Sequence, residues 1–393
     1  MPGFDVIVVG AGLMGSAAAR HLAKSGASVA IIGPGEPADK ANHNGVFASH
    51  YDQARITRQL ATSADWSRLS TNAINRYAEI ERESGLQFYH EVGAMMAGPG
   101  SGSMARYISS VEAVNASHNI QALRYEERTL REDFPYFEFP LGTVAYFEPN
   151  KAGYINPRQH VLAELIAAKK AGAKHVQAEV SKIDESSNGV TLTTTQGETY
   201  QAQKVIVATG GFSKQPGLLP NTVPLTIYAR TIAFFELDQA ECERLKAMPS
   251  LIYGGENFTE RVYVLPPVVY PDGKTYIKIG GDPTDIALET ERDIKEWLRS
   301  DGSAAVGEHL SQELLSIMPD LRFRSVSTDS CVTSMSPTDR PLIYPQTDRI
   351  IALTGGNGAG AKCADELGRL GAKIANGRSL NGEGYNTCFA PEG

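Results

Sequence analysis

The chain has 393 residues, which allows two or three domains and an ample hydrophobic core. Its 37 basic and 45 acidic side chains give a formal net charge of −8, which counts against nucleic acid as the main partner. No apolar run is long enough to span a bilayer, and no signal-peptide pattern precedes the first apolar segment. We therefore expect no membrane partner and a cytoplasmic location.

The cysteines and histidines do not form a recognisable framework. The four cysteines show no C-x-x-C spacing, and the eight histidines show no H-E-x-x-H or comparable spacing. We therefore expect neither a disulfide framework nor a metal site. The chain has no internal repeat, and we expect a monomer or a small homo-oligomer.

The first part of the chain has the pattern of a dinucleotide-binding unit. Residues 4–9 form an apolar run of strand length, a helical pattern follows to Gly26, and residues 28–32 form a second apolar run. A glycine-marked turn, Gly10-Ala11-Gly12-Leu13-Met14-Gly15, joins the first strand to the helix. Strand, turn, helix and strand in this order favour nucleotide binding over a purely structural turn.

Each glycine of this turn has a physical role in such a unit. Gly10 permits the tight turn, Gly12 lets the backbone approach a pyrophosphate, and Gly15 lets helix and strand pack closely. The start of the helix, at Leu13 and Met14, then presents free N–H groups and the positive end of the helix dipole to the phosphates. These five residues are expected to bind the cofactor.

Helices and strands alternate along the rest of the chain. A helix is expected over residues 65–84, and a longer one from the Asn156-Pro157 start signal to Gly172. An antiparallel sheet is expected within residues 225–285, and helices over residues 286–318. Shorter elements complete the pattern: strands at 175–180, 189–195, 199–201, 204–208 and 350–353, a last helix ending near Ala375, and a loose Gly/Asn-rich tail.

Two more glycine turns follow apolar strands. Val205 to Ala208 leads into Thr209-Gly210-Gly211, and Ile350 to Leu353 leads into the Gly355 to Gly360 loop that opens the last helix. The alternative for each is a loop that only needs positive φ. Their order after an N-terminal glycine turn favours bound FAD over NAD.

On these segments, and on Phe147-Glu148-Pro149-Asn150, the chain resembles the amine-oxidising flavoproteins of the D-amino-acid-oxidase superfamily, most closely monomeric sarcosine oxidase and N-methyltryptophan oxidase. The resemblance covers nearly the whole chain. It implies an α/β fold in which a Rossmann-like FAD-binding domain is interleaved with an α+β substrate domain built on an antiparallel sheet. The implied boundaries are 1–87, 150–222 and 326–380 for the FAD-binding domain, 88–149 and 223–325 for the substrate domain, and 381–393 for a loose tail.

The resemblance assigns chemistry to three residues. Cys331 lies where these oxidases join a cysteine to the flavin by a thioether, although residue type alone favours a buried apolar cysteine. Lys278 lies in a strand that resembles the one whose lysine lies over the flavin and promotes its reaction with O₂, because a fixed cation stabilises superoxide as it forms. The alternative is a solvated strand lysine. Arg55 matches an arginine beside the flavin.

Other residues match the substrate and cofactor positions of the family. Arg58, three residues after Arg55, and Lys362 match cations that clamp an α-carboxylate, with surface salt bridges as the alternative. Tyr263 resembles a tyrosine of the pocket wall. Besides the first glycine turn, the cofactor is expected to contact a further set of residues: Val180, Thr209, Gly210, Gly358, Gly360 and Lys362.

Several positions depart from the family pattern. The acidic residue expected for the adenosine ribose is replaced by Gly33, and Glu36 is its expected substitute. Tyr51 and Asp282 stand for histidines, and Thr333 stands for an aromatic residue. These changes predict a substrate that is bulkier or more polar than sarcosine, with a basic or polyhydroxyl substituent. The alternative is an aspartate that caps a loop outside the pocket.

The resemblance thus implies an FAD-dependent oxidase that converts the C–N bond of a secondary amino acid to an imine and reduces O₂ to hydrogen peroxide. N-methyl, cyclic and fructosyl amino acids all remain open as substrates. A first alternative is a dehydrogenase that passes electrons to a quinone or a carrier protein, and Lys278 counts against it. A second is a flavin-binding module without oxidase chemistry, and the acidic net charge counts against a nucleic-acid role for it.

Overall fold

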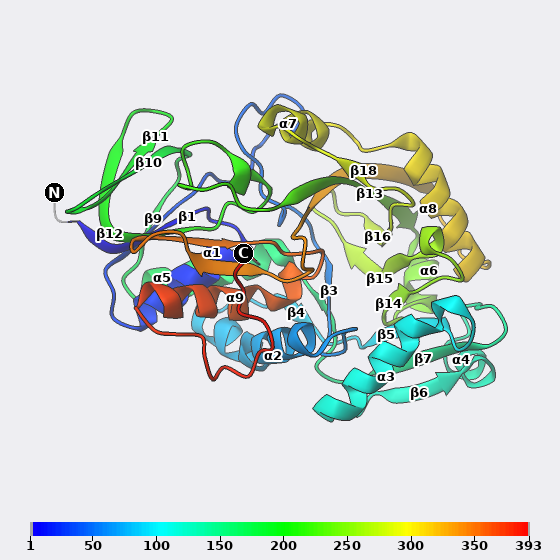
Figure 1. The fold of residues 1–393 in the computed structure, drawn as a ribbon. Helices are drawn as coiled ribbons and strands as arrows, with labels where there is room; N and C mark the ends of the chain where they lie inside the picture. Colours follow the sequence, from blue (N-terminus) through cyan, green and yellow to red (C-terminus); the bar gives the residue numbers. More distant parts are fainter. Residues whose placement is uncertain (1–2, 392–393) are drawn as a thin grey trace.

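Two large β-sheets organise the structure, a computed structural model in which residues 3–391 are described (Figure 1). The eight-stranded sheet contains β1 (Phe4–Val9), β2 (Val29–Ile32), β9 (Lys174–Val176), β10 (Val180–Ser186), β11 (Gly189–Thr194), β12 (Thr199–Val207), β19 (Leu342–Pro345) and β20 (Ile350–Thr354). Its order is β10-β11-β12-β1-β2-β9, with β20 beside β12 and β19 beside β20. β1 runs parallel to β2 and β12, and β12 runs parallel to β20, the arrangement of a dinucleotide-binding sheet.

The second sheet has nine strands, and nearly all its neighbours are antiparallel. It contains β5 (Ala94–Pro99), β6 (Leu123–Glu126), β7 (Thr143–Glu148), β13 (Thr226–Leu237), β14 (Ser250–Tyr253), β15 (Val262–Val269), β16 (Thr275–Gly280), β17 (Ile286–Ala287) and β18 (Ser325–Met335). A small third sheet joins β3 (Arg55–Thr57), β8 (Gly153–Ile155) and β4 (Tyr89–His90). β18 pairs with β13 over its whole length.

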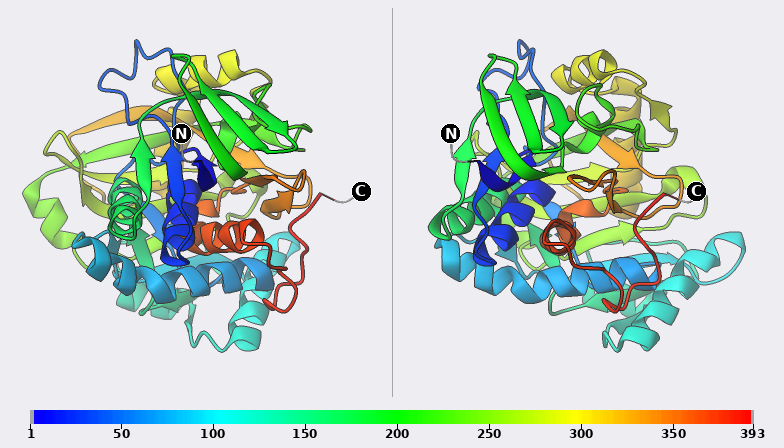
Figure 2. Two further views of the ribbon diagram at one scale, coloured as in Figure 1. Left: turned by 90° about the vertical axis from the view of Figure 1, so that its left-hand side faces the viewer. Right: turned by 60° about the vertical axis from the view of Figure 1, so that its left-hand side comes forward.

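Some of the helices cover the first sheet, and these helices lie in two layers. The helices are α1 (Leu13–Lys24), α2 (Ala64–Ser84), α3 (Arg106–His118), α4 (Glu127–Asp133), α5 (Pro157–Lys170), α6 (Gln239–Arg244), α7 (Glu291–Arg299), α8 (Ala304–Ile317) and α9 (Gly360–Ala375). α1 and α9 pack side by side under the sheet, where Leu22 and Leu367 share a core with Val8 of β1. α2 forms an outer layer beneath them (Figure 2).

Local sequence signals place several of these elements. Ser63 caps α2 by accepting the N–H of Trp66, and Gly85 ends the helix in the left-handed conformation with φ 81°. Asn156 caps α5 in the same way, and Pro157 occupies its first turn. The predicted helix over residues 65–84 and the predicted strand over 350–353 are confirmed within one residue at each end.

The helices expected over residues 286–318 are present as α7 and α8, after the short strand β17, and Ser300 ends the first helix while Ser303 caps the second. Two other predictions about local structure are wrong. The expected strand at 175–180 ends at Val176, and β10 starts at Val180. The tail is not loose throughout, because Phe389 is buried and its carbonyl accepts the N–H of Ile343; residues 392 and 393 lie outside the described part.

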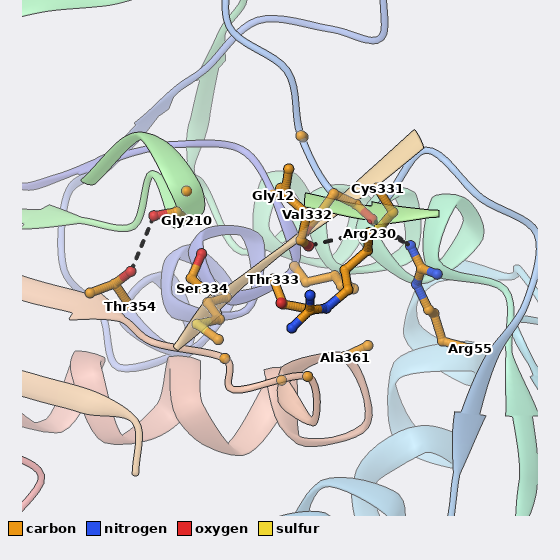
Figure 3. A pocket seen from close by; sticks show the side chains of 18 of the residues that line it. Gly12, Arg55, Gly210, Arg230, Cys331, Val332, Thr333, Ser334, Thr354 and Ala361 are labelled. Carbon is orange, nitrogen blue, oxygen red and sulfur yellow. Dashed lines mark hydrogen bonds between the residues drawn. The ribbon is translucent and has the colours of Figure 1, made fainter. Parts of the chain in front are cut away.

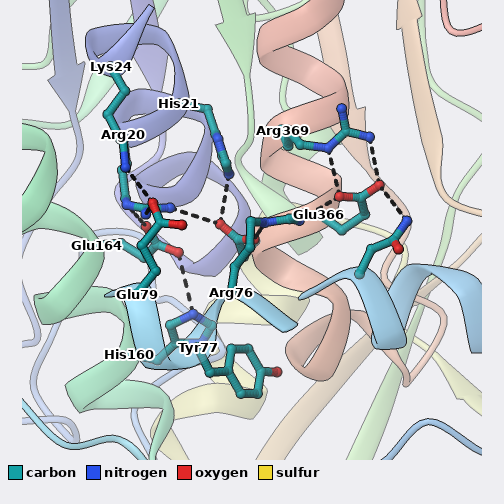
Figure 4. Close-up of polar contacts among 12 residues, drawn as sticks. Arg20, His21, Lys24, Arg76, Tyr77, Glu79, His160, Glu164, Glu366 and Arg369 are labelled. Carbon is teal, nitrogen blue, oxygen red and sulfur yellow. Dashed lines mark hydrogen bonds and ion pairs between the residues drawn. The ribbon is translucent and has the colours of Figure 1, made fainter. Parts of the chain in front are cut away.

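A buried ion-pair cluster joins helices α1, α2 and α9 (Figure 4). Arg20 of α1 is fully buried and contacts Glu79 at 2.7 Å and Asp365 at 3.3 Å. His21 also contacts Asp365, at 2.7 Å, and Arg76 of α2 completes the cluster. Each charge has a partner of opposite sign, as burial requires. The cluster fixes α1, α2 and α9 relative to one another.

Residues 3–391 contain neither a membrane-crossing helix nor a metal-binding cluster of side chains. No helix there combines the length and the hydropathy needed to cross a membrane. The same residues contain no group of three or more His, Cys, Asp or Glu side chains that could hold a metal ion.

Candidate active site

A cavity of about 550 Å³ is lined by residues from both large sheets (Figure 3). The first sheet contributes the carboxyl ends of β1, β12 and β20 with the glycine turns that follow them, the usual ligand position in an open α/β sheet. Most of the predicted site residues line it: Gly10, Gly12, Leu13, Met14, Arg55, Arg58, Val180, Thr209, Gly210, Tyr263, Asp282, Cys331, Thr333, Gly358, Gly360 and Lys362. Gly15, Glu36 and Lys278 are not among the lining residues.

The first glycine turn leaves the N-terminus of α1 open toward the cavity. Gly12 is the N-cap residue, and no side chain caps this helix. A Cβ atom on Gly12 would meet only His50 Nδ1, at 3.9 Å, so a ligand has room against the backbone. Gly10 has φ 103°, and a Cβ there would lie 2.4 Å from the Ala208 carbonyl oxygen, which excludes any side chain. Gly15 packs against the Gly10 carbonyl inside α1 rather than at the cavity.

The N-terminus of α9 faces the same cavity. Ala359 is its N-cap residue, and no side chain caps the helix. Gly360 lies close to Met14 of α1, because a Cβ there would be 3.0 Å from Met14 Cε. Thr354 Oγ1 donates a hydrogen bond to the Gly210 carbonyl at 3.3 Å and so ties β20 to the turn after β12 (Figure 3). Two helix N-termini therefore offer N–H groups to negatively polarised parts of a ligand.

Glu36, the residue expected to bind the adenosine ribose, pairs with Arg158 and is not among the residues that line the cavity. Both carboxylate oxygens of Glu36 accept hydrogen bonds from Arg158, at 2.8 and 2.6 Å. Gly33 and Pro34 line the cavity instead, and Val180 lines it as well. The structure therefore does not bring Glu36 together with the other predicted cofactor residues.

Cys331 lies on β18 and lines the cavity (Figure 3). Its backbone stands opposite Arg230 of β13. The guanidinium of Arg55 donates to Cys331 Sγ at 3.6 Å, and Trp297 Nε1 donates to the Cys331 carbonyl at 2.8 Å. The thiol is thus held beside a fixed positive charge.

Lys278, on β16, is 1% exposed and lies behind the cavity wall. Its ammonium pairs with Asp52 at 2.6 Å and also donates to the carbonyl of Ala54. Asp52 pairs in addition with Arg55 at 2.7 Å and accepts a hydrogen bond from the Tyr270 hydroxyl at 2.9 Å. One carboxylate therefore lies between two cations. The burial of Lys278 rules out the alternative of a solvated strand lysine.

Burial and charge act in opposite directions on these three groups. Burial lowers the pKa of Lys278 to about 8, although Asp52 opposes the shift. Burial would raise the pKa of Asp52, but the charges of Lys278 and Arg55 outweigh it and hold that pKa well below its usual range. Burial would likewise lower the pKa of Arg55, but Asp52 outweighs it. At neutral pH the cluster carries two positive charges and one negative charge.

Arg58 and Lys362 line the cavity as cations without an ion-pair partner in residues 3–391. Arg58 Nε points at Met96 Sδ at 3.3 Å. Lys362 Nζ lies 3.5 Å from the Trp66 carbonyl oxygen and 5.8 Å from the centre of its ring. Burial lowers the pKa of both groups. The structure therefore does not support the alternative of surface salt bridges at these two positions.

Glu148 belongs to the segment Phe147–Asn150, which resembles the family pattern. It lies near these two cations, but its carboxylate accepts hydrogen bonds from backbone N–H groups. Its carboxylate accepts the N–H groups of Gln59 and Leu60, at 3.0 and 2.9 Å. Burial raises its pKa to about 7, although the charges of Arg58 and Lys362 oppose the shift. A group with this pKa is only partly charged at neutral pH, so it compensates the two cations incompletely.

Asp282 and Thr333, two positions where the family pattern changes, line the cavity wall together with Tyr263. Asp282 accepts the N–H of Thr231 at 3.2 Å, and burial raises its pKa to about 6. Thr333 Oγ1 has no hydrogen-bond partner among the described residues. Tyr263 packs on Gly280, where a Cβ would lie 2.5 Å from the ring. Asp282 thus ties a loop to a strand and also lines the cavity.

The charged residues of this site that sequence reasoning missed include Asp52 and Arg230. Arg230 lines the cavity, and its guanidinium pairs with Asp285 at 2.6 Å. One signal was present for Asp52, which precedes Arg55 by three residues in an otherwise uncharged stretch. No local pattern reveals its pairing with Lys278, because 226 residues separate the two.

Known proteins share this fold and sequence pattern. The chain is 26% identical over 378 residues to monomeric sarcosine oxidase of Bacillus sp. (strain NS-129), covering 95% of this chain and 92% of that protein. It is 24% identical over 383 residues to N-methyl-L-tryptophan oxidase of Yersinia pestis (strain Pestoides F), covering 95% of each. Among solved structures, NikD, an amino acid oxidase essential for nikkomycin biosynthesis, aligns with a TM-score of 0.78 at 19% identity, over 100% of this chain and 98% of NikD.

These likenesses confirm the predicted α/β fold with a Rossmann-like FAD-binding part. They also agree with the predicted resemblance to the sarcosine-oxidase group. The family model described as FAD dependent oxidoreductase (DAO) matches residues 5–374. The chain therefore belongs to this family and is an FAD-dependent oxidoreductase.

Proposed function

We propose that this enzyme oxidises the C–N bond of a secondary amino acid to an imine and that O₂ accepts the electrons and becomes hydrogen peroxide. The observation that carries the proposal is the pair of cavity cations, Arg58 and Lys362, which have no ion-pair partner in the described chain. Uncompensated buried charge is costly, so an anionic ligand is expected between them. An α-carboxylate fits, because a guanidinium binds it through two donors and an ammonium adds a point charge.

The secondary amine is supported by the relatives. Two of them are named for sarcosine and N-methyl-L-tryptophan, which are both N-methyl amino acids. The substrate domain proposed from the sequence, residues 88–149 and 223–325, supplies Tyr263 and Asp282 to the cavity wall. We propose that the amine lies between this wall and the flavin.

The two helix N-termini and the glycine turns fit FAD. The open backbone at Gly12 and the uncapped start of α1 would hold the pyrophosphate, and the turn at Gly210 and the start of α9 would hold the flavin end. When bound, FAD supplies the redox chemistry. The chain's own residues orient the substrate through its carboxylate, limit water in the cavity and place fixed charges around the reacting atoms.

We further propose that the flavin is joined covalently to Cys331, which lines the cavity beside Arg55. The protein should then stay yellow after acid precipitation, with an intact mass increased by one flavin. Cys331→Ala should release the flavin or leave the protein without it, because the bond cannot form. Wild-type protein that gives a yellow supernatant and a colourless pellet would contradict the attachment. Cys242→Ala, on the remote helix α6, is the control and should keep the flavin.

The pocket predicts a substrate larger or more polar than sarcosine. Asp282 lines the cavity with a pKa raised to about 6 by burial, so a basic or hydroxyl-rich substituent would stabilise its charged form. Asp282→Ala should therefore lower turnover of a basic N-alkyl or sugar-derived amino acid more than turnover of sarcosine or pipecolate. Steady-state rates over this panel test the idea. An unchanged order of preference, with sarcosine best, would rule it out.

Peroxide release and oxygen uptake across an amine panel test the reaction as a whole. Peroxide formed in equal amount to consumed substrate supports the oxidase. The second candidate is a dehydrogenase of the same fold that passes electrons to a quinone or a carrier protein. Substrate oxidation that needs a quinone or dye and leaves O₂ untouched would establish the dehydrogenase.

A further inference from the structure

We propose that Asp52 is a positioning residue that holds the ammonium of Lys278 and the guanidinium of Arg55 side by side next to Cys331, and that it thereby sets the rate at which O₂ reoxidises the flavin. The inference rests on the proposed function, in which Lys278 assists the oxygen reaction. In that reaction O₂ gains two electrons and two protons from the reduced cofactor and solvent and leaves as hydrogen peroxide.

Asp52 is buried and makes several hydrogen bonds and ion pairs. Its side chain is 4% exposed. The carboxylate pairs with Lys278 at 2.6 Å and with Arg55 at 2.7 Å, and it accepts a hydrogen bond from the Tyr270 hydroxyl at 2.9 Å. The Ala54 carbonyl accepts a further hydrogen bond from the ammonium of Lys278. The carboxylate and this carbonyl fix Lys278 Nζ behind Arg55, which itself donates to Cys331.

Asp52 is the carboxylate that faces Lys278. The other ionisable groups around this cluster are Arg55, His50, Arg158, Tyr263 and Tyr270. None of them adds a negative charge, because burial raises the pKa of both phenols. Cys331 adds none either, since it is a thioether in the proposed holoenzyme. Without Asp52, two buried cations would lie next to each other with no compensating charge. The buried ammonium can lose its proton and the guanidinium cannot, so Lys278 would become neutral.

The pH dependence follows from this charge arrangement. Burial lowers the pKa of Lys278 to about 8, and Asp52 is the group that opposes this shift most strongly. The cation is present below that pKa and is lost as pH rises through it. In wild type the reoxidation rate should therefore fall with a midpoint near pH 8. In Asp52→Asn the midpoint should move down by about 1–3 pH units, as expected for loss of an adjacent opposite charge.

The experiment is a double-mutant cycle on the purified holoenzyme. Stopped-flow mixing of the photoreduced enzyme with O₂ gives the reoxidation rate between pH 6 and 9.5 for wild type, Asp52→Asn, Lys278→Met and the double variant. At pH 8, Asp52→Asn should reoxidise about 5-fold more slowly than wild type if the midpoint moves by 1 pH unit. If the midpoint moves by 3 pH units, the rate should approach that of Lys278→Met, about 10²-fold below wild type. The double variant should be no slower than Lys278→Met, because the carboxylate acts through the lysine.

A second readout does not depend on turnover. Titration of the flavin absorption spectrum with pH should show a transition near pH 8 in wild type, none in Lys278→Met, and one at lower pH in Asp52→Asn. Asp52→Glu keeps the charge and should restore the wild-type midpoint while slowing reoxidation, because its longer side chain displaces the carboxylate. Asp52→Glu also serves if Asp52→Asn does not fold.

Glu241→Gln is the matched control. Glu241 is 2% exposed and lies between Arg244 and Arg322 on the outer side of the second sheet, so its loss tests the general cost of removing a buried carboxylate. It should leave the spectral midpoint unchanged. If Lys278→Met reoxidises normally, the proposed role of Lys278 fails. If Lys278→Met is slow but Asp52→Asn keeps the wild-type rate and midpoint, the inference about Asp52 is wrong.

Discussion

Replacing Arg58 or Lys362 with alanine should weaken the binding of a carboxylate substrate by about 2–5 kcal/mol, the usual cost of losing a charged hydrogen-bonded contact from a desolvated site. The expectation follows from their position at the cavity without a carboxylate partner in the described chain. At 1.4 kcal/mol per factor of ten, this corresponds to roughly 30-fold to several thousand-fold in Kd. The dissociation constant from the reductive half-reaction measures the effect.

The same variants separate carboxylate binding from other losses. An amine of similar shape without a carboxylate should bind equally well to wild type, Arg58→Ala and Lys362→Ala. Lys182→Ala is a control for charge alone, because Lys182 is an exposed lysine paired with Asp184. Normal binding of carboxylates by either cavity variant would show that the residue concerned does not contact the substrate.

Lys278→Met should slow reoxidation of the flavin by about 10²–10³-fold, or ~2.7–4 kcal/mol in activation free energy, the typical loss when one preorganised charge is removed. Methionine has a similar length, and Lys278 is buried, so the change removes the charge with little change in packing. Reduction by substrate should change far less, because the cation is not needed to bind the carboxylate.

Measuring flavin reduction and flavin reoxidation separately tests the prediction for Lys278→Met. Anaerobic reduction and aerobic reoxidation are followed at the flavin absorption band in wild type and variant. The variant also leaves Asp52 with Arg55 as its remaining cation, so the melting temperature must be recorded alongside. Equal slowing of both half-reactions would count against a specific role in the oxygen reaction.

Local sequence patterns predicted the elements well where one short segment determines the structure. The turn at Gly10 needs a positive φ, and the helix after Asn156 has its cap and its proline within two adjacent residues. The buried position of Phe389 could not be read in this way. It depends on a backbone hydrogen bond to Ile343, far away in the sequence.

In the candidate site, too, local patterns predicted some residues, whereas others depend on contacts between distant segments. The residues of the glycine turns lie at the cavity because the carboxyl ends of parallel strands meet at one edge of the sheet. Glu36 was expected there for its charge, but it pairs with Arg158 on α5 and is not among the residues that line the cavity. The pairing of Lys278 with Asp52 arises only when β16 packs against the segment before β3. Such long-range pairs leave no periodic signal in the chain.

The position of the cavity between the two sheets has a consequence for stability. Its wall includes Gly12 at the start of α1 on one side and Cys331 on β18 on the other. A cofactor that contacts both surfaces binds only when both sheets are folded and correctly docked, so its binding free energy is added to the pair rather than to either sheet alone. A cofactor that contacts both walls of the cavity would therefore stabilise the docked arrangement of the two sheets. Unfolding of one sheet would then also remove the contacts between the cofactor and the other sheet.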